Sequence, residues 1–241
     1  MNTQILAVPN DKVTLYLIPT VISENSLNTI PSATIAVIHN LDYFIVERAR
    51  TARRFIKTTE PKKSIQDLTF IEFDDDDNSP EKQVISWLQS GKSVGVISES
   101  GMPGIADPGQ SIALLAHRSG FKVKSLIGPS SVSLALSASG LNGQNFSFHG
   151  YLPIKELELK KKLKELESLI HKTKQTQIFI ETPYRNNRMF KAIIKSLSNE
   201  TFLCVASDLT GASEYVKTER IQYWKSNPVD LKKLPTIFLL G

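Results

Sequence analysis

The chain has 241 residues, of which 41% are hydrophobic and 22% charged, with 12 glycines and 12 prolines. This composition is typical of a globular protein and excludes a collagen-like or wholly disordered chain, while the length fits one large or two small domains. The single cysteine, Cys204, excludes a disulfide within the chain, and the four histidines lack metal-ligand spacing, so we expect no metal. The formal net charge of +5 permits an anionic partner but does not by itself indicate nucleic acid.

The beginning of the chain, MNTQILAVPN, lacks the basic and apolar regions of a signal peptide. No run of about 18 apolar residues occurs in the sequence. We therefore expect a cytoplasmic protein without a membrane anchor.

Strands and helices are expected to alternate in the first third of the chain. The apolar run at 13–18 predicts a strand that ends at Pro19, and residues 32–40 fit either a helix or a strand. Residues 43–47 predict a short strand, and residues 49–57 a helix, because they are good helix formers without a breaker. The four aspartates at 74–77 predict a solvated loop, and a helix is expected from Pro80 to Gly91.

Two further sets of strand, loop and helix are predicted next. Residues 94–98 predict a strand, and Asp107 with Pro108 is expected to start a helix that ends at Gly120. Residues 121–127 predict another strand, and Ser130 or Ser131 is expected to cap a helix that ends at 140. This alternation predicts an α/β fold with a parallel sheet, whose ligand loops follow the carboxyl ends of the strands.

A change to turn-rich, aromatic sequence at 141–153 predicts a domain boundary, with one α/β domain at 1–144 and a second at 145–241. A long helix is expected from near Ile154, and further strands at 176–181, 202–207, near 214–219 and at 236–240, with a helix from 185 to about 197. The long helix carries an apolar stripe. Its members are Leu159, Leu163, Leu166 and Ile170.

The loop at 98–109 is the segment most suggestive of a ligand site. Gly101, Gly104 and Gly109 let the backbone approach a ligand, and two prolines restrict the turns. The sequence lacks the glycine-rich fingerprints of dinucleotide and nucleoside triphosphate sites. A G-x-S-x-G nucleophile motif is also absent.

Four segments occur in order along the chain: SESGMPGIADPG, GPSSVSLALSASGL, FSFHGYLP and FIETPYR. Together they resemble the tetrapyrrole methylase superfamily of S-adenosylmethionine-dependent methyltransferases, and within it the ribosomal small-subunit RNA 2′-O-ribose methyltransferase I branch. The resemblance implies two α/β domains with the cofactor in the cleft between them, usually in a homodimer. One departure follows Pro19, where TVISEN replaces the Ile-Gly-Asn stretch of that branch.

The resemblance also implies which residues hold S-adenosylmethionine. In the family, three loops of the first domain contact the cofactor, and segments of the second domain line its adenosine side. The matching positions here are Pro19, Thr20, Ser100, Gly101, Met102, Ser130, Ser131, Glu181, Asp208, Leu209, Thr210, Thr236 and Ile237.

A ribose hydroxyl as acceptor would need a base to remove its proton. The candidates are Glu47, Glu99 and Glu181, whereas Asp107 is better explained as a helix cap and Asp208 is a weaker candidate. Methyl transfer is an in-line displacement, so positioning of the acceptor is expected to contribute most.

A basic stripe fits an RNA substrate. On the helix expected around 48–57, four cations lie at helical spacing on one face, suited to a row of phosphates, although a solvated surface is the alternative. They are Arg50, Arg53, Arg54 and Lys57, and Arg185 would extend the basic rim. We therefore expect a methyltransferase acting on RNA of the ribosomal small subunit. A methyltransferase acting on a tetrapyrrole or other small molecule, and a non-catalytic cofactor-binding module, are the alternatives.

Overall fold

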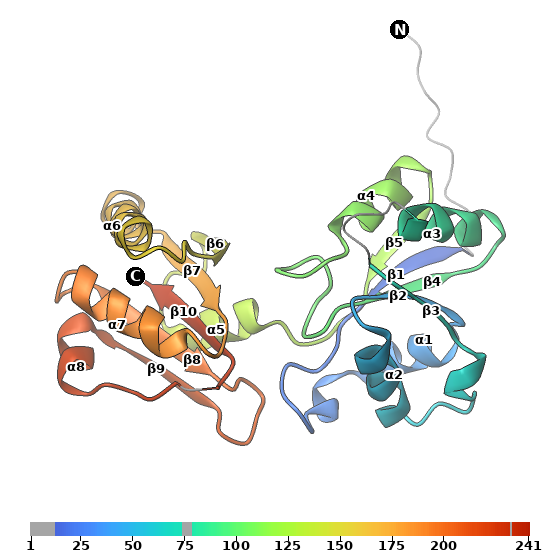
Figure 1. The fold of residues 1–241 in the computed structure, drawn as a ribbon, viewed down its shortest axis with the longest axis horizontal. Helices are drawn as coiled ribbons and strands as arrows, with labels where there is room; N and C mark the ends of the chain where they lie inside the picture. Colours follow the sequence, from blue (N-terminus) through green and yellow to red (C-terminus); the bar gives the residue numbers. More distant parts are fainter. Residues whose placement is uncertain (1–12, 74–78, 232) are drawn as a thin grey trace, which may run out of the picture. The chain divides into compact units, whose positions relative to one another are not determined.

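The computed structural model describes residues 13–73, 79–231 and 233–241. The chain folds into two compact units, one that ends at Pro129 and one from Ser130 to Gly241, and each is described by itself (Figure 1). The acidic run expected as a loop at 74–77 lies outside the described residues.

The first unit is built on a five-stranded sheet in the order β3-β2-β4-β1-β5 (Figure 1). Every pair of neighbouring strands is parallel, which confirms the parallel sheet predicted from the alternation of strands and helices. The sequence reading missed the short strand β3. The strands are β1 (Thr14–Ile18), β2 (Tyr43–Val46), β3 (Thr69–Glu72), β4 (Val94–Ile97) and β5 (Lys122–Ser125).

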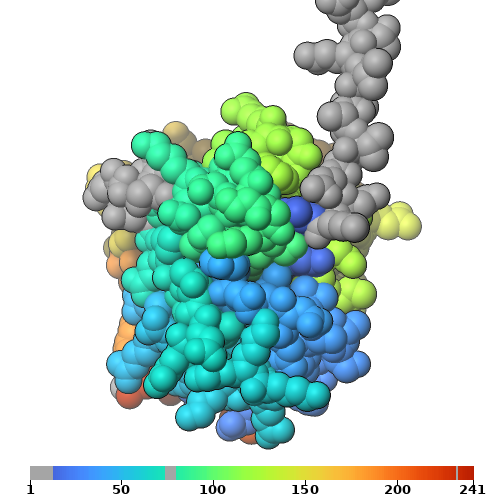
Figure 2. Space-filling model, turned by 90° about the vertical axis from the view of Figure 1, so that its right-hand side faces the viewer, coloured from blue at the N-terminus to red at the C-terminus, as the bar shows by residue number. Residues whose placement is uncertain are grey.

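Helices cover both faces of this sheet. On one face, Ile38 of α1 and Phe55 of α2 share a core with Phe44, and on the other, Trp87 of α3 and Ile112 of α4 share a second core. In Figure 2, α1 and α2 form the blue to cyan lower part of this unit and α3 the green upper part. The helices are α1 (Ser32–His39), α2 (Ala49–Thr58), α3 (Ser79–Gln89) and α4 (Gln110–Arg118), with 3-10 turns at Leu27–Thr29 and Ile65–Asp67.

The start of α4 differs from the prediction. Its N-cap is Gly109, with a φ of 131°, and Asp107 lies before the helix, so the expectation that Asp107 caps it was wrong. The backbone N–H of Gly104 donates to the Pro108 carbonyl over 3.1 Å, which closes the preceding segment into a turn of its own. The Asp107 carboxyl is therefore directed to other partners.

The second unit has a mixed sheet in the order β6-β7-β10-β8-β9. β6 and β7 are parallel, and the other neighbours are antiparallel. The predicted strands are confirmed, and β6 is a further strand within the turn-rich segment. The strands are β6 (Phe146–Tyr151), β7 (Thr176–Glu181), β8 (Phe202–Ser207), β9 (Tyr215–Arg220) and β10 (Thr236–Leu240).

The core of the second unit lies between this sheet and the helices that follow β6. The stripe Leu159, Leu163, Leu166 and Ile170 is buried in this core, as its spacing predicts. The helix α5 (Ser131–Ser139) packs against β10, β9 and β8. The second compact unit therefore begins at Ser130, before residue 145, where the sequence predicted the second domain to begin. The helices are α5 (Ser131–Ser139), α6 (Glu156–Thr173), α7 (Asn186–Ser196) and α8 (Ile221–Ser226). No helix among the described residues is both long and apolar enough to cross a membrane.

Candidate active site

The carboxyl edge of the parallel sheet gathers the most informative loops of the first unit. β2, β4, β1 and β5 are neighbours in the sheet, and all four point the same way. The residues that follow them, Glu47, Ser98, Pro19 and Leu126, therefore lie along one edge, where ligands bind in open α/β sheets.

Two close contacts hold these loops together. The Thr20 N–H donates to the Gly101 carbonyl over 2.8 Å, and Gly101 has a φ of 73°, which favours glycine. At Gly128, a Cβ atom would lie 2.3 Å from Cγ of Pro19, so only glycine lets these segments approach. The sequence's glycines and prolines thus fix the shape of the edge.

Three carboxylates cluster at this edge. The backbone N–H of Glu99 donates to Oε2 of Glu47 over 3.2 Å, so the structure brings these two predicted catalytic residues together. Asp107 joins them: burial raises the pKa of its carboxyl to about 6, the charges of Glu47 and Glu99 add to the rise, and hydrogen bonds from Ser98 and the Ser100 backbone oppose it.

Sequence reasoning ranked Asp107 below the glutamates as a candidate base, because the Asp-Pro-Gly run is typical of a helix start. The run does precede a helix, but the intervening turn shifts the start to Gln110. A pKa raised toward neutrality by burial and like charges marks a candidate functional site.

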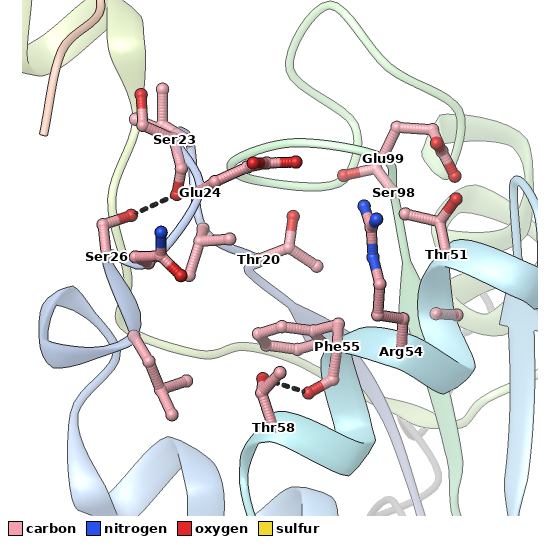
Figure 3. A pocket seen from close by; sticks show the side chains of 15 residues that line it. Thr20, Ser23, Glu24, Ser26, Thr51, Arg54, Phe55, Thr58, Ser98 and Glu99 are labelled. Atoms are coloured by element: carbon pink, nitrogen blue, oxygen red, sulfur yellow. Dashed lines mark hydrogen bonds between the residues drawn. The ribbon is translucent and has the colours of Figure 1, made fainter. Parts of the chain in front are cut away.

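A cavity of about 500 Å³ lies beside this edge (Figure 3). It is lined by the loop after β1, by α2 and by the end of β4. Thr20 lines it and is only 3% exposed, yet its hydroxyl has no hydrogen-bond partner among the described residues. Leaving a buried hydroxyl unpaired costs about 1–3 kcal/mol, so a ligand that bonds to it would recover this loss.

The four cations of the basic stripe on α2 have different surroundings. All four cations are exposed, but Arg54 lines the cavity, whereas the guanidinium of Arg53 lies 5.1 Å from the centroid of the Phe70 ring. Arg50 and Lys57 line no part of the cavity. The helix therefore presents one cation to the cavity and the others to its surroundings.

The remaining predicted positions near the loop at 98–109 differ in exposure. Ser100 is exposed and Met102 is half-buried. Ser130 is the buried N-cap residue of α5, as expected, but its side chain makes no cap hydrogen bond, and Ser131 begins the helix. Both serines belong to the second compact unit.

Predicted residues of the second unit meet at one edge of its sheet. Thr236 pairs with Glu181 on one side and with Ser207 on the other, and the Asp208 N–H donates to the Pro235 carbonyl over 2.9 Å. Leu209, Thr210 and Ile237 adjoin this row.

Glu181 already has partners within its own unit. Its Oε1 accepts from Arg185 Nε over 2.9 Å and from the Thr182 N–H over 2.7 Å, and its side chain is 5% exposed. Arg185 is thereby fixed as the partner of Glu181.

The turn after β8 is strained and contains unpartnered hydroxyls. Asp208 and Thr210 have φ values of 49° and 67°, in the left-handed region that costs non-glycine residues about 1–3 kcal/mol. Oγ of Ser207 and Oγ1 of Thr210 are buried and have no partner among the described residues. Ser207 was not predicted from the sequence, in which a serine at a strand end carries no distinguishing signal.

Within the described parts of the chain, no group of three or more His, Cys, Asp or Glu side chains is arranged to hold a metal ion.

The chain matches known proteins along most of its length. Residues 22–222 match the family model of the Tetrapyrrole (Corrin/Porphyrin) Methylases. The Ribosomal RNA small subunit methyltransferase I of Vibrio cholerae is 33% identical over 210 residues, which are 87% of this chain and 69% of that protein. The protein of the same name from Bacillus subtilis is 31% identical over 201 residues, which are 83% and 65% of the two chains.

Solved structures share the fold at low sequence identity. Diphthine synthase has a TM-score of 0.62 at 13% identity, with 95% of this chain and 89% of that chain covered. Uroporphyrin-III-C-methyltransferase from Thermus thermophilus has a TM-score of 0.56 at 14% identity, with 95% and 94% covered. The predicted two-unit α/β fold is thus confirmed, and the chain belongs to the tetrapyrrole methylase family of methyltransferases.

Proposed function

We propose that this protein transfers a methyl group from S-adenosylmethionine to a ribose 2′-hydroxyl of RNA in the small ribosomal subunit. The names of its relatives in Vibrio cholerae and Bacillus subtilis support the substrate. The observation that carries the proposal is the cluster of loops and carboxylates at the carboxyl edge of the parallel sheet, beside a cavity.

The residues present fit S-adenosylmethionine, which carries amino, carboxylate, hydroxyl and adenine groups that all form hydrogen bonds. The buried hydroxyls of Ser207 and Thr210, which have no partner among the described residues, can each bond to a polar group of such a ligand. The cofactor supplies a methyl group on a positively charged sulfur. Within the first unit we assign Pro19, Ser100, Gly101 and Met102 to the cofactor. Thr20 was predicted with them, but it lines the cavity and its hydroxyl is assigned to the acceptor. The family resemblance also predicts cofactor contacts for Ser130, Ser131, Asp208, Leu209, Thr210, Thr236 and Ile237.

The acceptor hydroxyl must lose its proton as it is methylated, and Glu99 is assigned as the proton acceptor because it lines the cavity. Glu47 holds the Glu99 backbone through its Oε2 and acts as a positioning residue. Glu181 positions Arg185 in the second unit. The exposed cations of α2 are assigned to RNA phosphates, and Arg185, which is half-buried and paired with Glu181, is assigned as a further contact.

We also propose that the protein is a cytoplasmic homodimer, in keeping with an RNA substrate inside the cell and with the expectation from its family.

The test is transfer of tritiated methyl groups from S-adenosylmethionine to purified small ribosomal subunits, total RNA and tetrapyrrole precursors. The proposal expects label in the small subunits, and a loss of about 100-fold in rate for Glu99→Gln, the usual scale of general-base catalysis. Label in a tetrapyrrole would reject the RNA substrate. Cofactor binding without any transfer would favour a non-catalytic module.

A further inference from the structure

The cavity of the first unit has an apolar floor and a polar rim. In Figure 3 the Phe55 ring lies below Thr20, while Glu24 and Glu99 lie above, on the loop after β1 and at the end of β4. Phe55 is 7% exposed and belongs to the core beneath the cavity. At about 500 Å³ the cavity falls within the usual range of about 300–1,000 Å³ for small-ligand sites. It is therefore of a size for one compact, partly apolar ligand.

The charged residues that line this cavity are the cation Arg54 and the carboxylates Glu24 and Glu99. The Arg54 side chain extends from α2 toward Ser98 at the end of β4 (Figure 3), and it forms no ion pair with any described residue. A guanidinium with free donors binds a phosphate through two parallel hydrogen bonds. The cavity thus offers one place for a single phosphate.

The rim selects against ligands with many carboxylates. A substituted tetrapyrrole with several carboxylates would face Glu24 and Glu99 and find only Arg54 as a counter-charge. Amino and hydroxyl groups, in contrast, can donate to these carboxylates, and a base edge can bond to the unpartnered Thr20 hydroxyl. A planar base, a ribose and one phosphate match all of these features together.

We propose that this cavity takes a single nucleotide extruded from RNA, with its phosphate on Arg54, its base over the apolar floor at Phe55 and a polar group on the Thr20 hydroxyl. Enzymes that modify nucleotides commonly extrude the target from its stack into such a pocket. The inference rests on the proposed function, because it names the part of the RNA that enters the site. Neighbouring phosphates would meet Arg50 and Arg53 on the same helix.

The test is titration of the full chain with the four ribonucleoside 5′-monophosphates and with the corresponding nucleosides, followed by nuclear magnetic resonance. We expect at least one monophosphate to bind about tenfold more tightly than its nucleoside, because a charged hydrogen bond is lost with the phosphate. Arg54→Gln should remove this difference. Arg50→Gln is the matched control, since it removes a cation of α2 that does not line the cavity.

Thr20→Val tests the second contact, because it deletes the hydroxyl at nearly constant volume. It should weaken the monophosphate and the nucleoside by the same factor, about three- to tenfold. Thermal melting of each variant checks that it is folded, and S-adenosylmethionine affinity should stay unchanged in Arg54→Gln.

The inference is overturned if the monophosphates bind no more tightly than the nucleosides, or if Arg54→Gln keeps that difference in affinity. The inference also fails if Arg54→Gln no longer binds S-adenosylmethionine, because the cavity would then be part of the cofactor site. It is also overturned if the protein methylates RNA and Arg54→Gln leaves the KM for RNA unchanged, and the proposed function then stands. If Arg54-dependent monophosphate binding occurs but RNA is never methylated, the nucleotide site stands and the proposed function fails.

Discussion

Asp107 is the residue whose chemistry the structure changes most. In the folded chain the pKa of its carboxyl is about 6, against 3.8 for an ordinary aspartate. Between pH 3.8 and about 6, the Asp107 carboxyl is therefore mostly protonated in the folded state and mostly ionised in the unfolded state. The resulting stabilisation is complete below pH 4 and is lost as the pH rises through about 6.

We therefore predict that Asp107→Asn raises the free energy of unfolding at pH 8 by about 1 kcal/mol, less than the full shift implies because the carboxyl is partly exposed. The gain should vanish at about pH 3, below both pKa values, where the aspartate is neutral in the folded and the unfolded state. Urea unfolding at the two pH values measures it. Equal gains at both would show that ionisation of Asp107 is not the cause.

Gly128 lies in close contact with Pro19, because a Cβ atom at position 128 would lie 2.3 Å from Cγ of Pro19. Gly128→Ala should lower the free energy of unfolding by about 1–3 kcal/mol, the usual cost of forced overpacking. Gly143→Ala is the control, since a Cβ atom there meets nothing within 4 Å. Similar stabilities of the two variants in thermal melts would contradict the close contact.

Individual residues also show where sequence reasoning succeeds. Glu47 and Glu99 could be predicted as neighbours because each follows a strand of one parallel sheet. Asp107 was a weaker candidate, because the choice between a cap and a site carboxylate depends on where a turn closes. The unpartnered hydroxyls of Thr20 and Ser207 depend on burial, which single residue types do not reveal.

Among the elements, helices and strands with strong apolar patterns were predictable, whereas β3 and α8 were not. The stripe of α6 runs from Leu159 to Ile170, about three helical turns, whereas β3 has no buried residue and α8 has only six residues. α5 was placed in the first domain because it follows that unit's last strand in sequence. It belongs to the second unit because it packs against β10.

We expect the exposed cations of the basic helix α2 to contribute to RNA binding. Arg50 and Lys57 are exposed, so replacing both with alanine should weaken RNA binding. The slope of log affinity against log salt should fall by up to about two units, one for each lost phosphate contact. Lys160→Ala with Lys161→Ala on α6 is the charge-matched control, and fluorescence anisotropy over a salt series is the measurement. Equal slopes in both double variants would remove α2 from the RNA contacts.

For the whole molecule, the proposed homodimer predicts a sedimenting species of twice the 26.9 kDa chain mass at micromolar concentration. Sedimentation velocity over a tenfold concentration range tests this. The same species should persist in high salt if apolar surface holds it together. A monomer throughout the range would contradict the proposal.

The central claim is methylation of a ribose hydroxyl in small-subunit RNA. The most direct measurement is to incubate unmodified small ribosomal subunits with the protein and S-adenosylmethionine, digest the RNA to nucleosides and identify the product by mass spectrometry. We predict one 2′-O-methyl nucleoside, formed by the wild type and strongly reduced with Glu99→Gln. Methylation on a base, or no methylated nucleoside from RNA at all, would contradict the claim.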